Sequence, residues 1–362
     1  MAVNDQLGNV SYLGFQAAMA GYIAALVCFG IEFASARGDA PTASEAVSMA
    51  IRAASRNRIA VMDRGTGSAE SGIGQIRKPD KRSQPMAPLF GRAGLIVTMI
   101  GFTAQVFSIV TRGLAAGRVP WGNMYEFTSL FCAAAVAGFL FVLYKTGGRS
   151  IGFFVMIPVV ILMFVGGTKL YTQVETLVPA LHSYWLLIHV LAVSLSSGVL
   201  MVSGVASVMY LLRARHERKL LAGKAWVSES KDGVRSGESA VPKRQVTIAD
   251  RSRLASLPSL AALDRVAYRT AIVAFPVFTF AVIAGAMWAE VAWGRYWGWD
   301  PKETSAFITW VFYAAYLHAR ATAGWRGSRA AWISVLGFLT VLFNLFFINI
   351  VVSGLHSYAG LN

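Results

Sequence analysis

Charged residues are scarce in this sequence. Lys, Arg, Asp and Glu make up 14% of its 362 residues, and 56% are hydrophobic. Soluble domains contain about a quarter charged residues, so this composition excludes an ordinary soluble globular protein. The sequence therefore predicts an integral membrane protein.

Cysteine and histidine are also few, and this limits the chemistry the chain can carry. Cys28 and Cys132 each lie inside an apolar run, and no C-x-x-C motif is present. We interpret both as buried, inert thiols, which excludes thiol redox chemistry as the function. The sequence also shows no paired carboxylates and no nucleophile with a neighbouring base. The five histidines are His182, His189, His216, His318 and His356.

Long apolar runs are what the sequence does contain. They predict an all-α integral membrane protein with about eight transmembrane helices, because a run of about 20 apolar residues crosses a bilayer as a helix. Small residues at positions 194, 196, 197, 198 and 204 predict close helix packing. The expected spans lie near 10–34, 89–111, 124–144, 151–168, 184–212, 268–290, 304–320 and 330–353.

Basic residues are distributed unevenly between the connections, and this predicts the orientation. Segments 37–92, 145–149, 213–269 and 320–329 hold 28 of the 33 Lys and Arg residues. The positive-inside rule places these segments in the cytoplasm, and both termini and the 288–303 loop on the extracytoplasmic side. The first run has no basic n-region or cleavage site, so it is expected to be a retained span. No nucleic-acid motif accompanies the net charge of +15.

Five segments follow from this topology. A basic amphipathic helix is expected at 42–60 within the first linker. The segments are a first span at 1–36, a basic cytoplasmic linker at 37–88, spans two to five at 89–212, a second basic linker at 213–265, and the last three spans with the 288–303 loop at 266–362.

The stretch from Trp293 to Glu303 combines tryptophans, glycines and charges between two apolar runs. Such a segment suits the membrane interface, where it is expected to form a flat apolar platform with a polar rim for a planar anionic ligand. An aromatic belt that binds nothing remains an alternative. Asp300 also reads as a helix N-cap, with Pro301 at N1 and Glu303 reaching back.

A second helix start resembles the first. Asn123 and Glu126 stand at the N-cap and N3 positions of the third span, so helix capping is sufficient to explain both.

His189 lies about one and a half turns into the fifth span, near the extracytoplasmic interface. His318 follows Pro301 by 17 residues, which places it near the cytoplasmic end of its helix. Asn344 and Asn349 are expected to bond across helices.

The motif WGxxWxWDPKE at 293–303 resembles the tryptophan-rich "WWD" signature of haem-handling membrane proteins of cytochrome c biogenesis. The whole chain resembles the CcsA (ResC) branch of that superfamily. Further matching segments are WGNMYEF at 121–127, WLLIHV at 185–190, YLHAR at 316–320 and GLHS at 354–357. The resemblance covers about residues 90–212 and 266–362.

This resemblance implies a function in which haem b is moved and presented for covalent attachment to apocytochrome c CxxCH motifs, as part of a cytochrome c synthase complex. It implies that His189 and His356 are axial ligands of haem at the WWD site, and that His318 belongs to a second, inner haem site. The missing partner histidine there implies a ResB-like membrane subunit. The location implied is the bacterial inner membrane. The other expected haem-binding residues are Trp293, Trp297, Trp299, Asp300 and Arg295, with Lys302 as an alternative cation for the propionates.

Three other functions remain open. A haem exporter would form no stable complex with a CxxCH peptide. A quinol-linked oxidoreductase would need four histidines inside the bilayer, and only His318 is clearly deep in the sequence pattern. A structural assembly scaffold would use the tryptophans as an anchor and bind no haem.

Overall fold

The computed structural model describes residues 4–35, 86–120, 122–174, 183–232, 253–349 and 351–352. Within these ranges all regular structure is helical, which confirms the predicted all-α class. The helices are α1 (Asp5–Ser35), α3 (Met86–Ala116), α4 (Met124–Thr146), α5 (Ile151–Lys169), α6 (Tyr184–Asp232), α8 (Leu260–Trp293), α9 (Pro301–Ala321) and α10 (Ser328–Phe343), with a 3-10 turn η3 (Arg253–Ser256) and a π turn η4 (Asn344–Ile348).

Seven of the eight described helices are long and apolar enough to cross a membrane, so the chain is a multi-pass membrane protein. The exception, α9, has 21 residues, which is still long enough to cross the hydrocarbon core. Its sequence is less apolar because it buries polar side chains, such as Ser305 and Thr309, inside the bundle. Two helices run beyond their predicted ends. α6 continues to Asp232, into the expected second linker, and α8 begins at Leu260.

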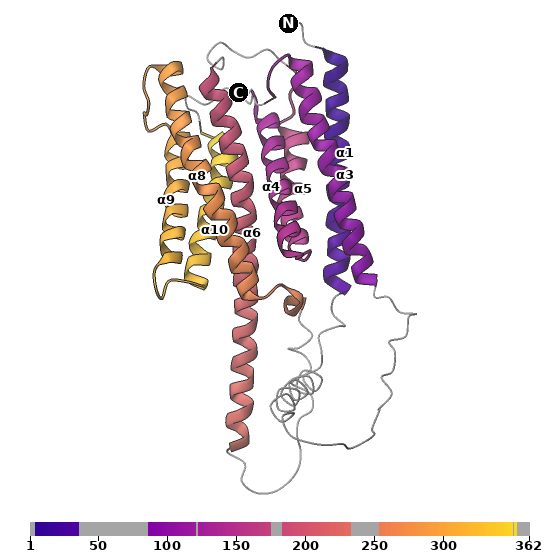
Figure 1. Ribbon diagram of the computed structural model, residues 1–362, viewed down its shortest axis with the longest axis vertical. Helices are drawn as coiled ribbons and strands as arrows, with labels where there is room; N and C mark the ends of the chain where they lie inside the picture. Colours follow the sequence, from indigo (N-terminus) through magenta and orange to yellow (C-terminus); the bar gives the residue numbers. More distant parts are fainter. Residues whose placement is uncertain are drawn as a thin grey trace, which may run out of the picture.

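The helices form one bundle with α6 in its middle (Figure 1). α1 packs along α3 and also contacts α5, which in turn contacts α4. α6 contacts α4, α8 and α10, and α9 packs against α8 and α10. One end of the bundle, at the top of Figure 1, holds the first residues of α4, α6 and α9 and the last residues of α3 and α8. We call it the cavity end, and the other the opposite end.

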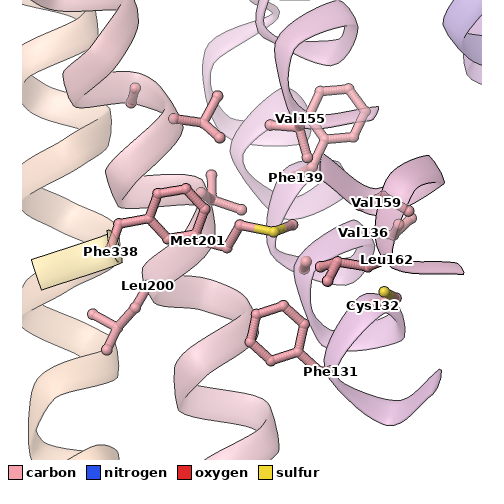
Figure 2. Packing of buried hydrophobic residues seen from close by; sticks show 14 of the residues in the cluster. Phe131, Cys132, Val136, Phe139, Val155, Val159, Leu162, Leu200, Met201 and Phe338 are labelled. Carbon is pink, nitrogen blue, oxygen red and sulfur yellow. The ribbon is translucent and has the colours of Figure 1, made fainter. Parts of the chain in front are cut away.

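Buried apolar side chains from α4, α5, α6 and α10 meet in the centre of the bundle (Figure 2). Glycines on α6 allow this close approach. A Cβ at Gly198 would lie 2.6 Å from the Phe131 carbonyl oxygen, and one at Gly204 would lie 2.5 Å from Phe338 Cβ. Both distances are shorter than any tolerated contact, so these positions require glycine. Close packing at these small residues was predicted and is confirmed.

Candidate functional site

A cavity lies at the cavity end, between the first turns of α4, α6 and α9, the end of α8, and the α10–η4 junction. Most of the side chains around it are apolar or aromatic, and a few polar groups face into it. This combination is typical of small-molecule sites. Its lining residues include Asn123, Phe127, Leu186, His189, Val282, Gly285, Trp288, Trp297, Lys302, Glu303, Asn344 and Asn349.

His189 is the imidazole that faces this cavity. It lies in the second turn of α6, as predicted, because that helix begins at Tyr184. Its Nδ1 lies 2.7 Å from the backbone oxygen of Ala281 in α8. A carbonyl oxygen only accepts, so Nδ1 carries the proton and donates it. The other ring nitrogen, Nε2, therefore keeps a lone pair, which is the form of histidine that binds metals.

Two residues of α8 place this ring. A Cβ at position 285 would lie 2.7 Å from Nδ1 of His189, so the ring fits only because Gly285 has no side chain. The buried Trp288 ring lies nearly parallel to the imidazole, at an interplanar angle of 13° and a centroid separation of 6.4 Å. Neither residue was predicted from the sequence to belong to the site. Their signal was the helical spacing of positions 281, 285 and 288, which share one helix face.

The three loop tryptophans lie in different surroundings. Trp293 packs against Trp288 with ring centroids 4.8 Å apart, and Trp297 lines the cavity. Trp299 is 66% exposed and adopts a left-handed backbone, with φ 57°. The rings of Trp297 and Trp299 are perpendicular, at 90°. The expected flat platform is therefore wrong in its geometry, because edge-to-face packing replaces a single plane.

The charged half of the loop begins α9. Asp300 accepts a hydrogen bond from the Lys302 backbone N–H, and the Glu303 carboxylate accepts from the backbone N–H groups of Asp300, at 3.1 Å, and Gly298, at 2.8 Å. The predicted capping box is thereby confirmed. The Arg295 guanidinium lies against Gly298, where a Cβ would otherwise stand, and Arg295 is not among the residues that line the cavity.

Lys302 is the one lysine or arginine among the described residues that line the cavity. Its ammonium donates to Oδ1 of Asn349. The Asn349 amide in turn donates to the backbone oxygens of Asn344, at 2.9 Å, and Leu345, at 2.8 Å. Asn344 donates to the Lys302 backbone oxygen at 3.3 Å. Bonding of both asparagines across helices was predicted and is confirmed.

Glu126 does more than cap a helix. The Asn123 side chain accepts from the Glu126 backbone N–H at 2.9 Å, as predicted. The carboxylate of Glu126, however, accepts from Arg112 and Arg118 at 2.9 Å each, and from the Gly122 backbone N–H at 2.8 Å. Capping alone was therefore an incomplete interpretation. These buried bonds tie the cavity wall at residues 122–123 to α3.

The remaining histidines are not brought to the cavity within the described part of the chain. His318 lies near the C-terminal end of α9, at the opposite end, with an exposed side chain. His216 is buried on α6. His182 and His356 lie outside the described residues, as does the amphipathic helix expected at 42–60.

Comparison with known proteins identifies the family of this chain. A family model described as "Cytochrome C assembly protein" matches residues 121–356, which include every described residue around the cavity. A relative named cytochrome c biogenesis protein CcsA from Heterosigma akashiwo is 38% identical over 258 residues, covering 67% of this chain and 77% of its own.

Relatives with the same name occur in other organisms. The protein from Guillardia theta is 33% identical and covers 74% of this chain and 87% of its own. That from Synechococcus elongatus is 36% identical and covers 75% of this chain and 87% of its own. This chain is therefore a member of the cytochrome c assembly protein family, of the CcsA type.

Proposed function

We propose that this chain, which has the role in cytochrome c biogenesis shared by its family, binds haem b in the cavity and presents it for covalent attachment to apocytochrome c. In this proposal the cavity end faces the extracytoplasmic side of a bacterial inner membrane. The predominance of basic residues in the other connections supports that orientation.

The observation that carries the proposal is the state of His189. Because Nδ1 donates its proton to the Ala281 carbonyl oxygen, Nε2 keeps its lone pair. The ring lines an apolar, aromatic cavity. A histidine held this way by a backbone carbonyl is a typical haem ligand. Within the described residues no three of His, Cys, Asp and Glu converge on one point.

The rest of the proposed haem site combines described and undescribed residues. Trp297 lines the cavity, where its ring would cover the porphyrin. His356, outside the described residues, would supply the second axial imidazole. The sequence-based assignments of Trp293, Trp299, Asp300 and Arg295 stay predictions. In the structure Asp300 caps the helix that carries Lys302, which gives it a positioning role.

Attachment requires little acid or base chemistry from this chain. Each CxxCH thiol adds across one vinyl double bond, so that a C–S bond forms on one carbon and the thiol hydrogen goes to the other. No external oxidant is needed for this addition. The chain's contribution would be to hold the porphyrin by His189, orient it against the aromatic walls, and keep water away from it. The peptide's own histidine would then replace a chain imidazole and release the product.

His318 supports a proposed partner. Its side chain is exposed on α9 at the opposite end, where an imidazole from a second membrane subunit could reach the same ligand. We propose that a ResB-like protein occupies this face and completes an inner haem site.

The test is the visible spectrum of the protein purified with its co-expressed partner. His189→Ala should lose or alter the reduced bis-histidine spectrum, and added imidazole should restore it. The matched control is His182→Ala, which removes a histidine seven residues earlier in the sequence and should leave the spectrum unchanged. An unchanged spectrum in His189→Ala would remove the cavity assignment. Incubation with CxxCH and AxxAH peptides then separates haem attachment from transport. Only the CxxCH peptide has thiols that can form thioethers, so attachment would give a covalent product with that peptide alone.

A further inference from the structure

The charged groups around the cavity are few, and they are placed asymmetrically. Lys302 and Glu303 are the two Lys, Arg, Asp or Glu residues among the described residues that line it. The Glu303 carboxylate accepts hydrogen bonds from two backbone N–H groups of the loop, and its negative charge repels an anion. An anionic edge of a ligand therefore has one favourable position, beside Lys302.

The Lys302 ammonium is held toward the cavity by a specific partner. It donates to Oδ1 of Asn349, whose amide group is fixed by the backbone oxygens of Asn344 and Leu345. An ammonium has three donors, and Asn349 takes one of them. The amide oxygen of Asn349 is neutral and adds no negative charge beside the ammonium, while Asp300 is a neighbouring carboxylate that interacts with it electrostatically. The lysine can thus bind a carboxylate while the asparagine continues to hold it.

Arg295 differs from Lys302 in its position and in its neighbours. Its guanidinium packs against Gly298 in the loop, and Arg295 does not line the cavity. From the sequence alone, both side chains were candidates to bind the propionates. We propose that Lys302 binds a carboxylate of the porphyrin, and that Asn349 positions the lysine for it. This inference rests on the proposed porphyrin site and names the residue that orients the ligand in it.

The test uses protoporphyrin IX without iron, because its binding does not depend on an axial histidine. Fluorescence titration of the purified protein, against an empty-micelle blank, should show that wild type binds the dicarboxylate about tenfold or more tightly than Lys302→Gln, since a hydrogen bond between charged groups is lost. Lys302→Arg should retain most of the affinity. Lys145→Gln, which removes a lysine at the far end of α4, is the matched control and should bind as wild type.

A second arm changes the ligand, and its first comparison, made on wild type alone, does not depend on a variant that folds. The dimethyl ester of protoporphyrin IX should bind wild type about tenfold more weakly than the dicarboxylate, and Lys302→Gln should not discriminate between the two. Asn349→Leu should lower dicarboxylate affinity and leave ester affinity unchanged.

The outcomes separate this inference from the proposed function. Equal affinity of wild type and Lys302→Gln for the dicarboxylate would overturn the lysine assignment, even if the His189 spectrum behaves as expected. A loss in Arg295→Gln without a loss in Lys302→Gln would also overturn it, in favour of the arginine. If wild type binds neither porphyrin, the porphyrin site itself is refuted, and the inference with it.

Discussion

The two ends of the helix bundle differ in how far the polar side chains compared below are buried and hydrogen-bonded. At the cavity end His189 is bonded to a backbone oxygen, and Glu126 is 2% exposed with its carboxylate fully engaged. At the opposite end His318 is exposed, and the ion pair of Arg213 with Glu217 is partly open to the surroundings. The cavity end is thus preorganised by the chain itself, whereas the opposite end leaves a histidine available to another molecule.

Preorganisation has a physical purpose in a site that binds a large rigid ligand. Binding is tighter when side chains already occupy their bound positions, because less conformational freedom is lost. Charges buried at the cavity end are stable only while every partner remains, since an unpaired buried charge is costly. The partly open pair of Arg213 and Glu217 at the opposite end is closer to a surface ion pair, so it contributes less and tolerates change better. The following variants test this contrast, in order of expected effect.

Glu126→Gln should have the largest effect on stability. It leaves the buried Arg112 and the partly buried Arg118 without their carboxylate, so the free energy of unfolding should fall by about 3 kcal/mol. Glu217→Gln, its counterpart at the opposite end, should cost about 0.5 kcal/mol or less. Thermal unfolding midpoints in detergent provide the comparison. Equal shifts for the two variants would contradict the proposed difference between the ends.

Gly285→Ala should displace the His189 ring, because the added Cβ would lie 2.7 Å from Nδ1. Loss of the oriented ligand should weaken haem binding by about 10- to 100-fold. Gly138→Ala on α4 is the control, since a Cβ there has its nearest contact at an ordinary 3.5 Å. Haem titrations followed by absorbance measure both, and wild-type affinity in Gly285→Ala would argue against His189 as the ligand.

Asp300→Ala should remove the N-cap of α9 and lower stability by about 1 kcal/mol. Because Lys302 lies two residues after the cap and its backbone N–H donates to Asp300, porphyrin binding should weaken as well. Ser259→Ala removes the N-cap of α8 at the opposite end and should destabilise the protein without changing porphyrin affinity. If the two variants affect binding equally, the cap has no specific link to the cavity.

His318→Ala should have the smallest effect on the isolated chain. An exposed side chain contributes about 0.5 kcal/mol or less to stability, and the cavity lies at the other end, so its haem spectrum should be unchanged. Haem bound together with the co-purified partner should decrease. A spectrum altered to the same extent in the absence of the partner would show that the two ends are not independent.

Much of the fold followed from the sequence, because local rules determine it. Apolar length predicted the spans, and the capping box at Asp300 and Glu303 was predicted because its partners are three residues apart. The same rule gave only half of the role of Glu126, whose bond to Arg112 joins residues of two helices. The fit of Gly285 against His189 likewise depends on how α6 and α8 pack, which periodicity does not specify.

Exposure was also difficult to predict. Trp299 and Trp297 belong to one motif, yet one is exposed and the other lines the cavity. The left-handed backbone of Trp299 turns its side chain away, and a sequence contains no direct signal for that conformation at a tryptophan. For His318, helix length gave its place near the end of α9, but which side of α9 faces the bundle depends on its packing against α8 and α10.

The π turn η4 makes the partner of Lys302 depend on residue number as well as residue type. A π turn holds one more residue than an α turn, so later side chains are rotated by about 100° from their positions on an uninterrupted α-helix. Asn349 follows η4 directly. If the same residues formed an α turn, Asn349 would turn away from the lysine, whereas deleting one residue from 345–348 would restore an α turn and keep Asn349 facing it. A homologue that lacks one residue here would therefore form an uninterrupted α-helix and still present the asparagine to the lysine.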